Sequence, residues 1–474
     1  MRENNNIVAL IEPTIKVKKL AIPDFESDLD TSGQTPVLSK TFNITPLAVI
    51  NGYELTPDKL ETFEISTTSF IPTCRFSFYD NDLLFTARHF PKDSDVIEVY
   101  VRSTGTEKEF KAIRMDFSIN SIRPFAGDGV TLYTVEGYAN IPGLLKEDVS
   151  WFEGTSFDAL LEIASNVELG YASNLENTED AQIWINPCDS AQKFIQDAVS
   201  NSYYNDTSFL TAYVDLHYYL TFVEINSILN QKEDNSAISA QLSNPPDTIG
   251  LGDEASDFTA PRLITNASEY SNTSFYIEKY TPLTNAGSVN KLTGTKRWAQ
   301  WWDYTEREFI SEWVEQSPKS DEGYISTVST ELPENEQILK YKYLGIQCDN
   351  VHTNYLYSNI LNHQNTMYIS KYGMEVVLSS FNPSLLLYSK VYCHIVEYAD
   401  QVKRTLTYSE TAEDYPADAV RRQDGDNTLD HNTTIVNEML SGWWLITGID
   451  IIYKKGNVLN QKLYLNRREI KPSV

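Results

Sequence analysis

The chain has 474 residues, more than one hydrophobic core usually serves, so we expect roughly two to four domains. Its 38 Lys and Arg residues stand against 66 Asp and Glu residues, which gives a formal net charge of −28. A surface with such an excess of negative charge repels phosphates and anionic lipid, which argues against DNA binding through a basic patch. The same charge could also serve solubility alone. The hydrophobic fraction of 41% is sufficient for folded cores.

Four cysteines, Cys74, Cys188, Cys348 and Cys393, lie far apart and form no CxxC pair. The first nineteen residues hold no uninterrupted apolar stretch of the kind that a secretory signal needs. We therefore expect reduced, buried thiols and synthesis in a host cytoplasm. No apolar run approaches the roughly 20 residues that cross a bilayer, so we expect no membrane insertion.

The N-terminal third predicts an arm followed by a β-barrel. Residues 1–40 mix short apolar patches with Pro, Asp and Ser, which predicts an extended arm. Residues 41–148 predict the barrel. Within them, 96–102 and 113–120 alternate apolar and polar residues with the period of two that a half-buried strand requires. Turn signals rich in Asp, Asn and Gly separate these strands, as in a small barrel or sandwich.

Residues 149–230 predict an α/β insertion domain. Thr155 or Ser156 can cap a helix, and Asp158 is placed to complete a capping box with Thr155. Apolar residues then recur at helical spacing, and Gly170 can end the helix.

Three further elements are expected in the insertion. A second helix should begin at Asp189 or Ser190, and a third from Thr207. The aromatic and β-branched run 216–225 predicts a buried strand after the third helix. The domain thus alternates helices and strands.

Residues 231–364 predict a linker followed by a Trp-rich connecting domain. The stretch 231–260 is poor in apolar residues and rich in helix breakers, which is typical of a linker or mobile loop. Trp298, Trp301 and Trp302 share one face of a helix, so we expect a helix that packs between domains. The alternative is that these aromatic side chains form a partner-docking face.

Residues 365–474 predict a second β-barrel, interrupted by an acidic loop at about 399–432. A turn at 454–457 indicates a hairpin close to the C-terminus. The fold class that follows is α+β and mainly β, with two small β-barrels, the α/β insertion and the extended N-terminal arm. The expected strands of this barrel are 372–378, 391–396 and 443–452.

The residues that could bind a metal are sparse. Cys348, His352 and His363 could supply three zinc ligands, but no fourth ligand is evident and structural zinc sites usually come as two close pairs. The acidic loop 424–430 could hold calcium, but it lacks the Gly and Glu of an EF-hand. Buried Cys and His residues and a solvated loop are the simpler interpretations.

No catalytic signature stands out either. Gly250, Gly252 and Ala255 match a dinucleotide fingerprint, but they follow a Pro-Pro loop and no βαβ unit surrounds them. The chain has no Walker A loop and no GxSxG elbow. We assign no catalytic, cofactor-binding or metal-binding residue, and we expect no cofactor and no enzyme activity.

Several segments are more specific than a strand or turn pattern. In the first predicted barrel they are Phe70-Ile71-Pro72-Thr73-Cys74, His89-Phe90-Pro91-Lys92-Asp93 and Gly137-Tyr138-Ala139-Asn140-Ile141-Pro142. In the insertion they are Phe152-Glu153-Gly154-Thr155-Ser156 and Asp215-Leu216-His217-Tyr218-Tyr219-Leu220, and near the C-terminus Gly442-Trp443-Trp444-Leu445-Ile446-Thr447-Gly448 and Leu463-Tyr464-Leu465-Asn466-Arg467-Arg468-Glu469. In this order they resemble the baseplate central hub proteins of contractile-tailed bacteriophages.

The resemblance implies a structural virion protein of the tail baseplate. Hub proteins of this kind contribute two related barrels per chain, so that a homotrimer forms a ring with pseudo-sixfold symmetry. Such a ring joins the tail tube or tube-initiator proteins above to the tail spike below, beside other baseplate proteins. Double-stranded DNA would pass through without specific binding during ejection, and an acidic bore would repel it. We also expect the arm to become ordered on a neighbouring subunit.

Three alternatives stay open. The chain could be the hub of a bacterial contractile injection system. It could be a hub fused to a cell-wall-degrading hydrolase, in which case residues 231–341 would carry the catalytic carboxylates. It could also be a binding module in which Trp298, Trp301 and Trp302 form a carbohydrate platform, which requires exposed aromatic faces.

Overall fold

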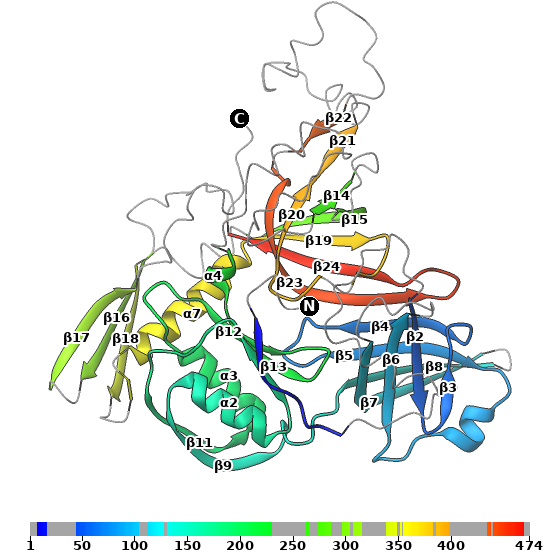
Figure 1. The fold of residues 1–474 in the computed structure, drawn as a ribbon, viewed down its shortest axis with the longest axis horizontal. Helices are drawn as coiled ribbons and strands as arrows, with labels where there is room; N and C mark the ends of the chain where they lie inside the picture. The colour runs from blue at the N-terminus through cyan, green and yellow to red at the C-terminus, as the bar shows by residue number, and fades with distance from the viewer. Residues whose placement is uncertain are drawn as a thin grey trace, which may run out of the picture.

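The computed structural model confirms a mainly β chain of the α+β class that contains two barrels and an α/β insertion (Figure 1). Strands of both barrels belong to a single hydrogen-bonded sheet of thirteen strands. The residues that the structure describes are 7–16, 44–103, 112–127, 130–229, 262–265, 274–285, 296–303, 307–314, 338–347, 351–352, 354–382, 385–398, 434–437 and 439–468.

The first barrel is a curved sheet of seven strands in the order β4-β5-β8-β7-β6-β2-β3. Its inner face is closely packed with aromatic side chains, among them Phe63, Phe76 and Phe78, which are fully buried. Alternation of buried and half-buried residues along β4 and β5 leaves a polar outer face. The strands are β2 (Ile44–Ile50), β3 (Tyr53–Leu55), β4 (Leu60–Ser66), β5 (Thr73–Asp80), β6 (Val96–Ser103), β7 (Ile113–Gly127) and β8 (Val130–Ala139).

The second barrel is a closed ring of six strands, because β20 pairs with both β14 and β23. Trp444, Leu463 and Val376 lie in its core. The strands follow the order β20-β14-β15-β19-β24-β23. Their bounds are β14 (Arg262–Ile264), β15 (Ser274–Thr284), β19 (Tyr372–Leu378), β20 (Lys390–His394), β23 (Gly442–Lys454) and β24 (Asn460–Arg467), while β21 (Val396–Tyr398) and β22 (Thr434–Val436) pair separately.

The insertion has three layers, in which two helices lie between two small sheets (Figure 1). Thr155 caps the first helix and forms the predicted capping box with Asp158; Ser190 caps the second, also as predicted. The elements are β9 (Glu147–Gly154), α2 (Ser156–Asn166), β10 (Gly170–Ser173), β11 (Gln182–Ser190), α3 (Ala191–Asn201), β12 (Leu210–Val214), β13 (Tyr219–Glu224) and α4 (Ile225–Leu229). β9 pairs with β11, and β10 pairs with β13 in parallel.

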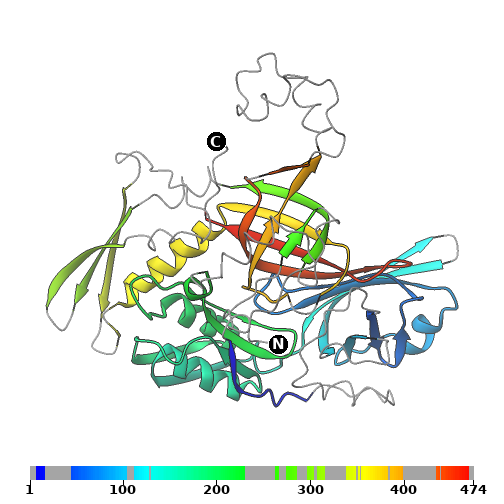
Figure 2. The same ribbon diagram turned by 45° about the horizontal axis from the view of Figure 1, so that its top comes forward.

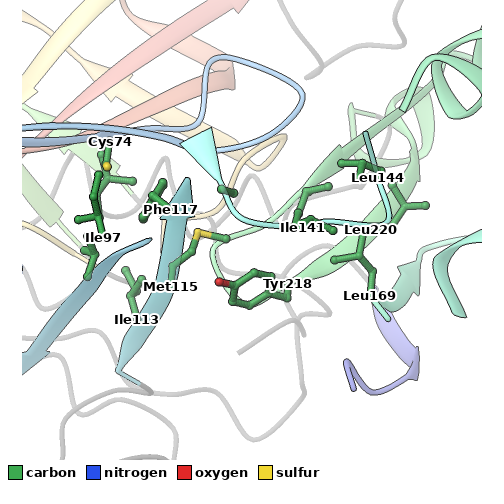
Figure 3. Packing of buried hydrophobic residues seen from close by; sticks show 14 of the residues in the cluster. Cys74, Ile97, Ile113, Met115, Phe117, Ile141, Leu144, Leu169, Tyr218 and Leu220 are labelled. Atoms are coloured by element: carbon green, nitrogen blue, oxygen red, sulfur yellow. The ribbon is translucent and has the colours of Figure 1, made fainter. Parts of the chain in front are cut away.

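One apolar core runs from the first barrel into the insertion (Figure 3). Tyr218 lies between Met115 of β7 and Leu220 of β13 in this view. Its hydroxyl accepts a hydrogen bond from the backbone N–H of Asp116 at 2.7 Å, so the buried phenol has a partner. The insertion is therefore held to the first barrel by both packing and a buried hydrogen bond.

The Trp-rich segment forms strands, so the predicted helix is wrong. β16 (Lys296–Asp303) and β17 (Glu308–Val314) form a hairpin, and β18 (Ile338–Gln347) pairs with β16 in parallel. The hairpin register places Trp302 opposite Phe309, and their rings meet edge to face at 4.9 Å. Aromatic residues favour strands, and the cross-strand aromatic partner outweighs the helical spacing.

Two expectations inside the insertion also need correction. The helix expected from Thr207 is strand β12, because its aromatic and β-branched residues pair with β13. The first helix ends at Asn166 with Val167 as its C-cap, and Gly170 begins β10. A Cβ at Gly170 would lie 2.8 Å from the carbonyl oxygen of Ile11, so glycine permits a close approach of strands here.

The arm and the connecting segment differ from expectation as well. β1 (Val8–Ile11) pairs with β10 of the same chain, whose edge offers free backbone groups, so this part of the arm is not reserved for a neighbouring subunit. The range 231–364 supplies β14 and β15 to the second barrel, where they complete the ring. Residues 1–6 and 17–40 of the arm, the linker 231–260 and the acidic loop 399–432 lie outside the described residues.

The helix α7 (Tyr355–Ile369) was not predicted from the sequence. This helix lies between the insertion and the β16–β18 sheet in Figures 1 and 2, and it contacts α3, β16, β17 and β24. Among the described helices, none combines the length and the apolar content that crossing a membrane requires.

Candidate functional site

The candidate metal ligands do not come together in the part of the chain that the structure describes. There, no three His, Cys, Asp or Glu side chains could share an ion. His352 packs instead among Trp184, Tyr203 and Tyr355, and its Nε2–H donates to the backbone carbonyl of Asn201 at 3.2 Å. Cys348, the acidic loop 424–430 and the segment 250–255 lie outside the described residues.

The buried ring of His352 makes stability depend on pH. Burial lowers the pKa of His352 below its ordinary value of about 6.5, although the charge of Asp180 opposes this. The neutral ring therefore contributes stability that is fully present above about pH 6.5 and lost as the pH falls toward the lower folded-state pKa. We expect the free energy of urea unfolding to fall between pH 7.5 and 5 more in the unsubstituted protein than in His352→Gln. An equal fall in both proteins would contradict this.

The three cysteines that the structure describes divide into two kinds. Cys74 of β5 and Cys393 of β20 are buried, one in each barrel, and burial raises the pKa of both thiols. Cys188 at the end of β11 is exposed, so the expectation of buried thiols is wrong at this position.

The most informative region is the junction at which β23 of the second barrel pairs with β4 of the first. The register runs from Asp450 opposite Ser66 to Lys454 opposite Thr62. Thr67 extends the pairing, because its backbone N–H donates to the carbonyl oxygen of Ile449 at 2.9 Å. The hydroxyl of Thr67 donates to the same oxygen at 3.0 Å and accepts from the N–H of Ile449 at 3.1 Å.

Side chains reinforce the junction along its inner face and at one end. On the inner face Ile451 is opposite Ile65, and both are fully buried in the core of the first barrel. The phenol of Tyr453 donates to the backbone carbonyl of Pro57 at 2.9 Å. At the outer end Lys455 pairs with Glu61 at 2.5 Å. A strand ladder with a shared apolar core makes the two barrels one unit, not two domains on a linker.

The outer face of the joined sheet is polar on both sides of the junction. Because cross-strand partners share a face, Glu64, Arg75 and Glu136 lie on the same side as Asp450 and Lys462. Arg75 pairs with Glu136 at 3.4 Å, and Lys462 pairs with Glu375 at 2.9 Å. An open hollow of about 390 Å³ lies on this face, lined mainly by polar residues of β4, β5 and β8.

Burial and neighbouring charges shift the pKa of two side chains on this face, Glu64 and Lys462. Burial raises the pKa of Glu64, and the charge of Asp450 adds to the effect. Burial alone would lower the pKa of Lys462, but hydrogen bonds to Tyr464 and Glu375 outweigh it and raise that pKa to about 12. The face thus presents charges of both signs in contact with one another.

The insertion is tied to the second barrel by polar contacts. The guanidinium group of Arg468 donates to the side-chain oxygens of Asn226 at 3.0 Å and Asn365 at 3.3 Å. The ammonium group of Lys390 donates to the backbone carbonyl of Leu229 at 3.3 Å and lies over the ring of Trp443. These contacts, with those of Tyr218, fix the insertion against both barrels.

The chain is similar to known proteins in its three-dimensional structure, but not in its sequence. No family model matches the sequence, and no curated protein matches it. The chain is similar to a tail protein from Neisseria meningitidis MC58, with a TM-score of 0.47 and 12% identity over 90% of this chain and 97% of that one. It is equally similar (TM-score 0.47) to the 43 kDa tail protein of prophage MuSo2 from Shewanella oneidensis, with 8% identity and the same coverages.

A third similarity is to the c3393 protein of E. coli, with a TM-score of 0.39 and 8% identity over 90% of this chain and 79% of that one. That protein is a component of the type VI secretion system and is described as structurally similar to the T4 bacteriophage tail proteins gp27 and gp5.

Proposed function

We propose that the protein is the trimeric hub of a contractile phage tail baseplate and that it acts by assembly, not by catalysis. The observation that carries the proposal is the junction between β4 and β23, which fixes two barrels side by side in one chain. Three such chains supply six barrels, so a threefold ring can present nearly sixfold symmetry. That ring would adapt a sixfold tail tube to a threefold spike.

The polar outer face of the joined sheet suits the wall of a DNA channel. A water-filled channel needs polar side chains, and DNA passes freely only where no basic surface holds its phosphates. Three cations of this face already contact carboxylates: Arg75 and Arg123 contact Glu136, and Lys462 contacts Glu375. We infer that this face lines the bore, and that the bore is acidic or neutral. A positive potential, calculated from a ring structure, would contradict this.

The mass of the purified protein tests the ring. Three chains of 54.0 kDa give 162 kDa, which is the mass that light scattering should return, and negative-stain averages should show a threefold ring with a central hole. A mass of 54.0 kDa at every concentration, with no ring in the presence of the spike and tube proteins encoded by neighbouring genes, would contradict the proposal.

A further inference from the structure

The two-stranded sheet of the insertion has apolar residues on both of its faces. Phe152 of β9 and Trp184 of β11 point inward, where Phe152 meets Phe194 of α3 with ring centroids 5.4 Å apart. The register places Ile185 opposite Trp151 on the outer face. Trp151 is 66% exposed and Ile185 is 57% exposed, so the helices cover only the inner face.

The outer face forms one continuous apolar patch. Val149 is 72% exposed and Ile183 is 39% exposed, and Pro187 lies opposite Val149 at the end of the ladder. Because alternate residues of a strand share a face, these side chains adjoin Trp151 and Ile185. A cluster of large exposed apolar side chains around a tryptophan is typical of a protein interface.

Carboxylates flank the patch at both ends. Glu147 and Glu153 lie on the same face of β9 as Trp151, separated by six residues or roughly 20 Å of strand. β9 and β11 contain no Lys or Arg. Along the chain, the cations that flank the two strands are Lys146, which precedes β9, and Lys193, which follows β11 and pairs with Asp189 at 2.8 Å. The rim of the patch is therefore acidic.

This charge pattern selects the kind of partner. A second copy of the same face would bring acidic rims together, and an anionic membrane would be repelled in the same way. A protein with an apolar centre and a Lys or Arg on each side would satisfy both features. The sheet lies at the lower edge of the molecule in Figure 1, below α2 and α3 and away from the barrels, so such a partner has access.

We propose that the outer face of β9 and β11, centred on Trp151 and Ile185 and bounded by Glu147 and Glu153, is a docking surface for a partner protein with a basic-flanked apolar segment. The proposal goes beyond the hub assignment and does not depend on ring formation. It assigns the insertion a binding role that the barrels do not supply.

Two synthetic strand peptides of about nine residues, each apolar on one face, test the proposal. One peptide has a lysine at each end, and the other has a glutamate at each end. Titration of the labelled peptides by fluorescence anisotropy should show binding of the lysine peptide at least about tenfold tighter than the glutamate peptide. The double variant Trp151→Ser with Ile185→Ser should bind the lysine peptide at least about tenfold more weakly than the unsubstituted protein does. Glu147→Lys with Glu153→Lys should reverse the preference.

The matched control is Phe125→Ser with Leu283→Ser, which removes equally exposed apolar side chains elsewhere and should bind like the unsubstituted protein. Equal binding of both peptides, or unchanged binding in both site variants, would overturn the proposal. So would a loss of self-association in Trp151→Ser with Ile185→Ser, since the face would then hold a second copy. Unchanged urea midpoints would establish that the variants are folded.

Discussion

Glu224→Ala should destabilise the protein by roughly 3–5 kcal/mol, because it leaves several buried backbone N–H groups without an acceptor. The carboxylate of Glu224 accepts from the N–H of Phe209 at 2.8 Å and from that of Asn226 at 3.0 Å. It also accepts from the N–H of Ser227. One buried side chain thus begins α4 and closes the end of the β12–β13 pair.

Two further variants make this prediction specific. Burial raises the pKa of Glu224, so its charge carries a desolvation cost that Glu224→Gln would remove while keeping an acceptor oxygen. We expect that variant to lose less than about 1.5 kcal/mol. Glu176→Ala, an exposed carboxylate in the same domain, should change stability by less than about 0.5 kcal/mol. Urea unfolding measures all three, and an equal loss in Glu224→Ala and Glu176→Ala would show that the carboxylate is not structural.

Ile451→Ala should weaken both barrels together. Ile451 belongs to β23 but is buried in the core of the first barrel, so its removal leaves a cavity at the junction that costs about 2–5 kcal/mol. Cys74 and Cys393 report the opening of the first and second barrel, since both thiols are buried. Mass spectrometry of thiol labelling should show both rates rising at least about 30-fold, the factor that corresponds to 2 kcal/mol.

Leu55→Ala provides the comparison, because Leu55 is fully buried on β3, at the far edge of the first barrel. Because the junction makes the two barrels one unit, this variant should also accelerate the labelling of both Cys74 and Cys393. If either Leu55→Ala or Ile451→Ala accelerated the labelling of one thiol alone, the barrels would open independently and the junction would not make them a unit.

Local signals in the sequence predicted many elements correctly. The strand 372–378 and the capping box of Thr155 and Asp158 depend only on residues close together in the sequence. A local sequence pattern is therefore enough to predict them. The Trp-rich segment was mispredicted because residues four apart, such as Trp298 and Trp302, share one face of a helix as well as one face of a strand. The segment forms a strand because it pairs with β17 across a turn. The spacing of apolar residues alone does not show that pairing.

The features that carry function were harder to predict because they depend on distant parts of the chain. Thr67 and Ile449 meet across 382 positions, and no local pattern indicates that β23 continues into the first barrel. The docking surface, by contrast, has a local signal in the sequence of β9. Val149, Trp151 and Phe152 place apolar residues on both faces of one strand, which indicates a strand covered on both sides.

A cryo-electron microscopy map of the purified assembly would test the central claim most directly. We predict a threefold ring of six barrel-shaped lobes in which each chain fills two adjacent lobes, with unbroken density from β4 to β23 between them. A ring in which each chain contributes a single lobe, or particles in which the two barrels of a chain separate, would contradict the account.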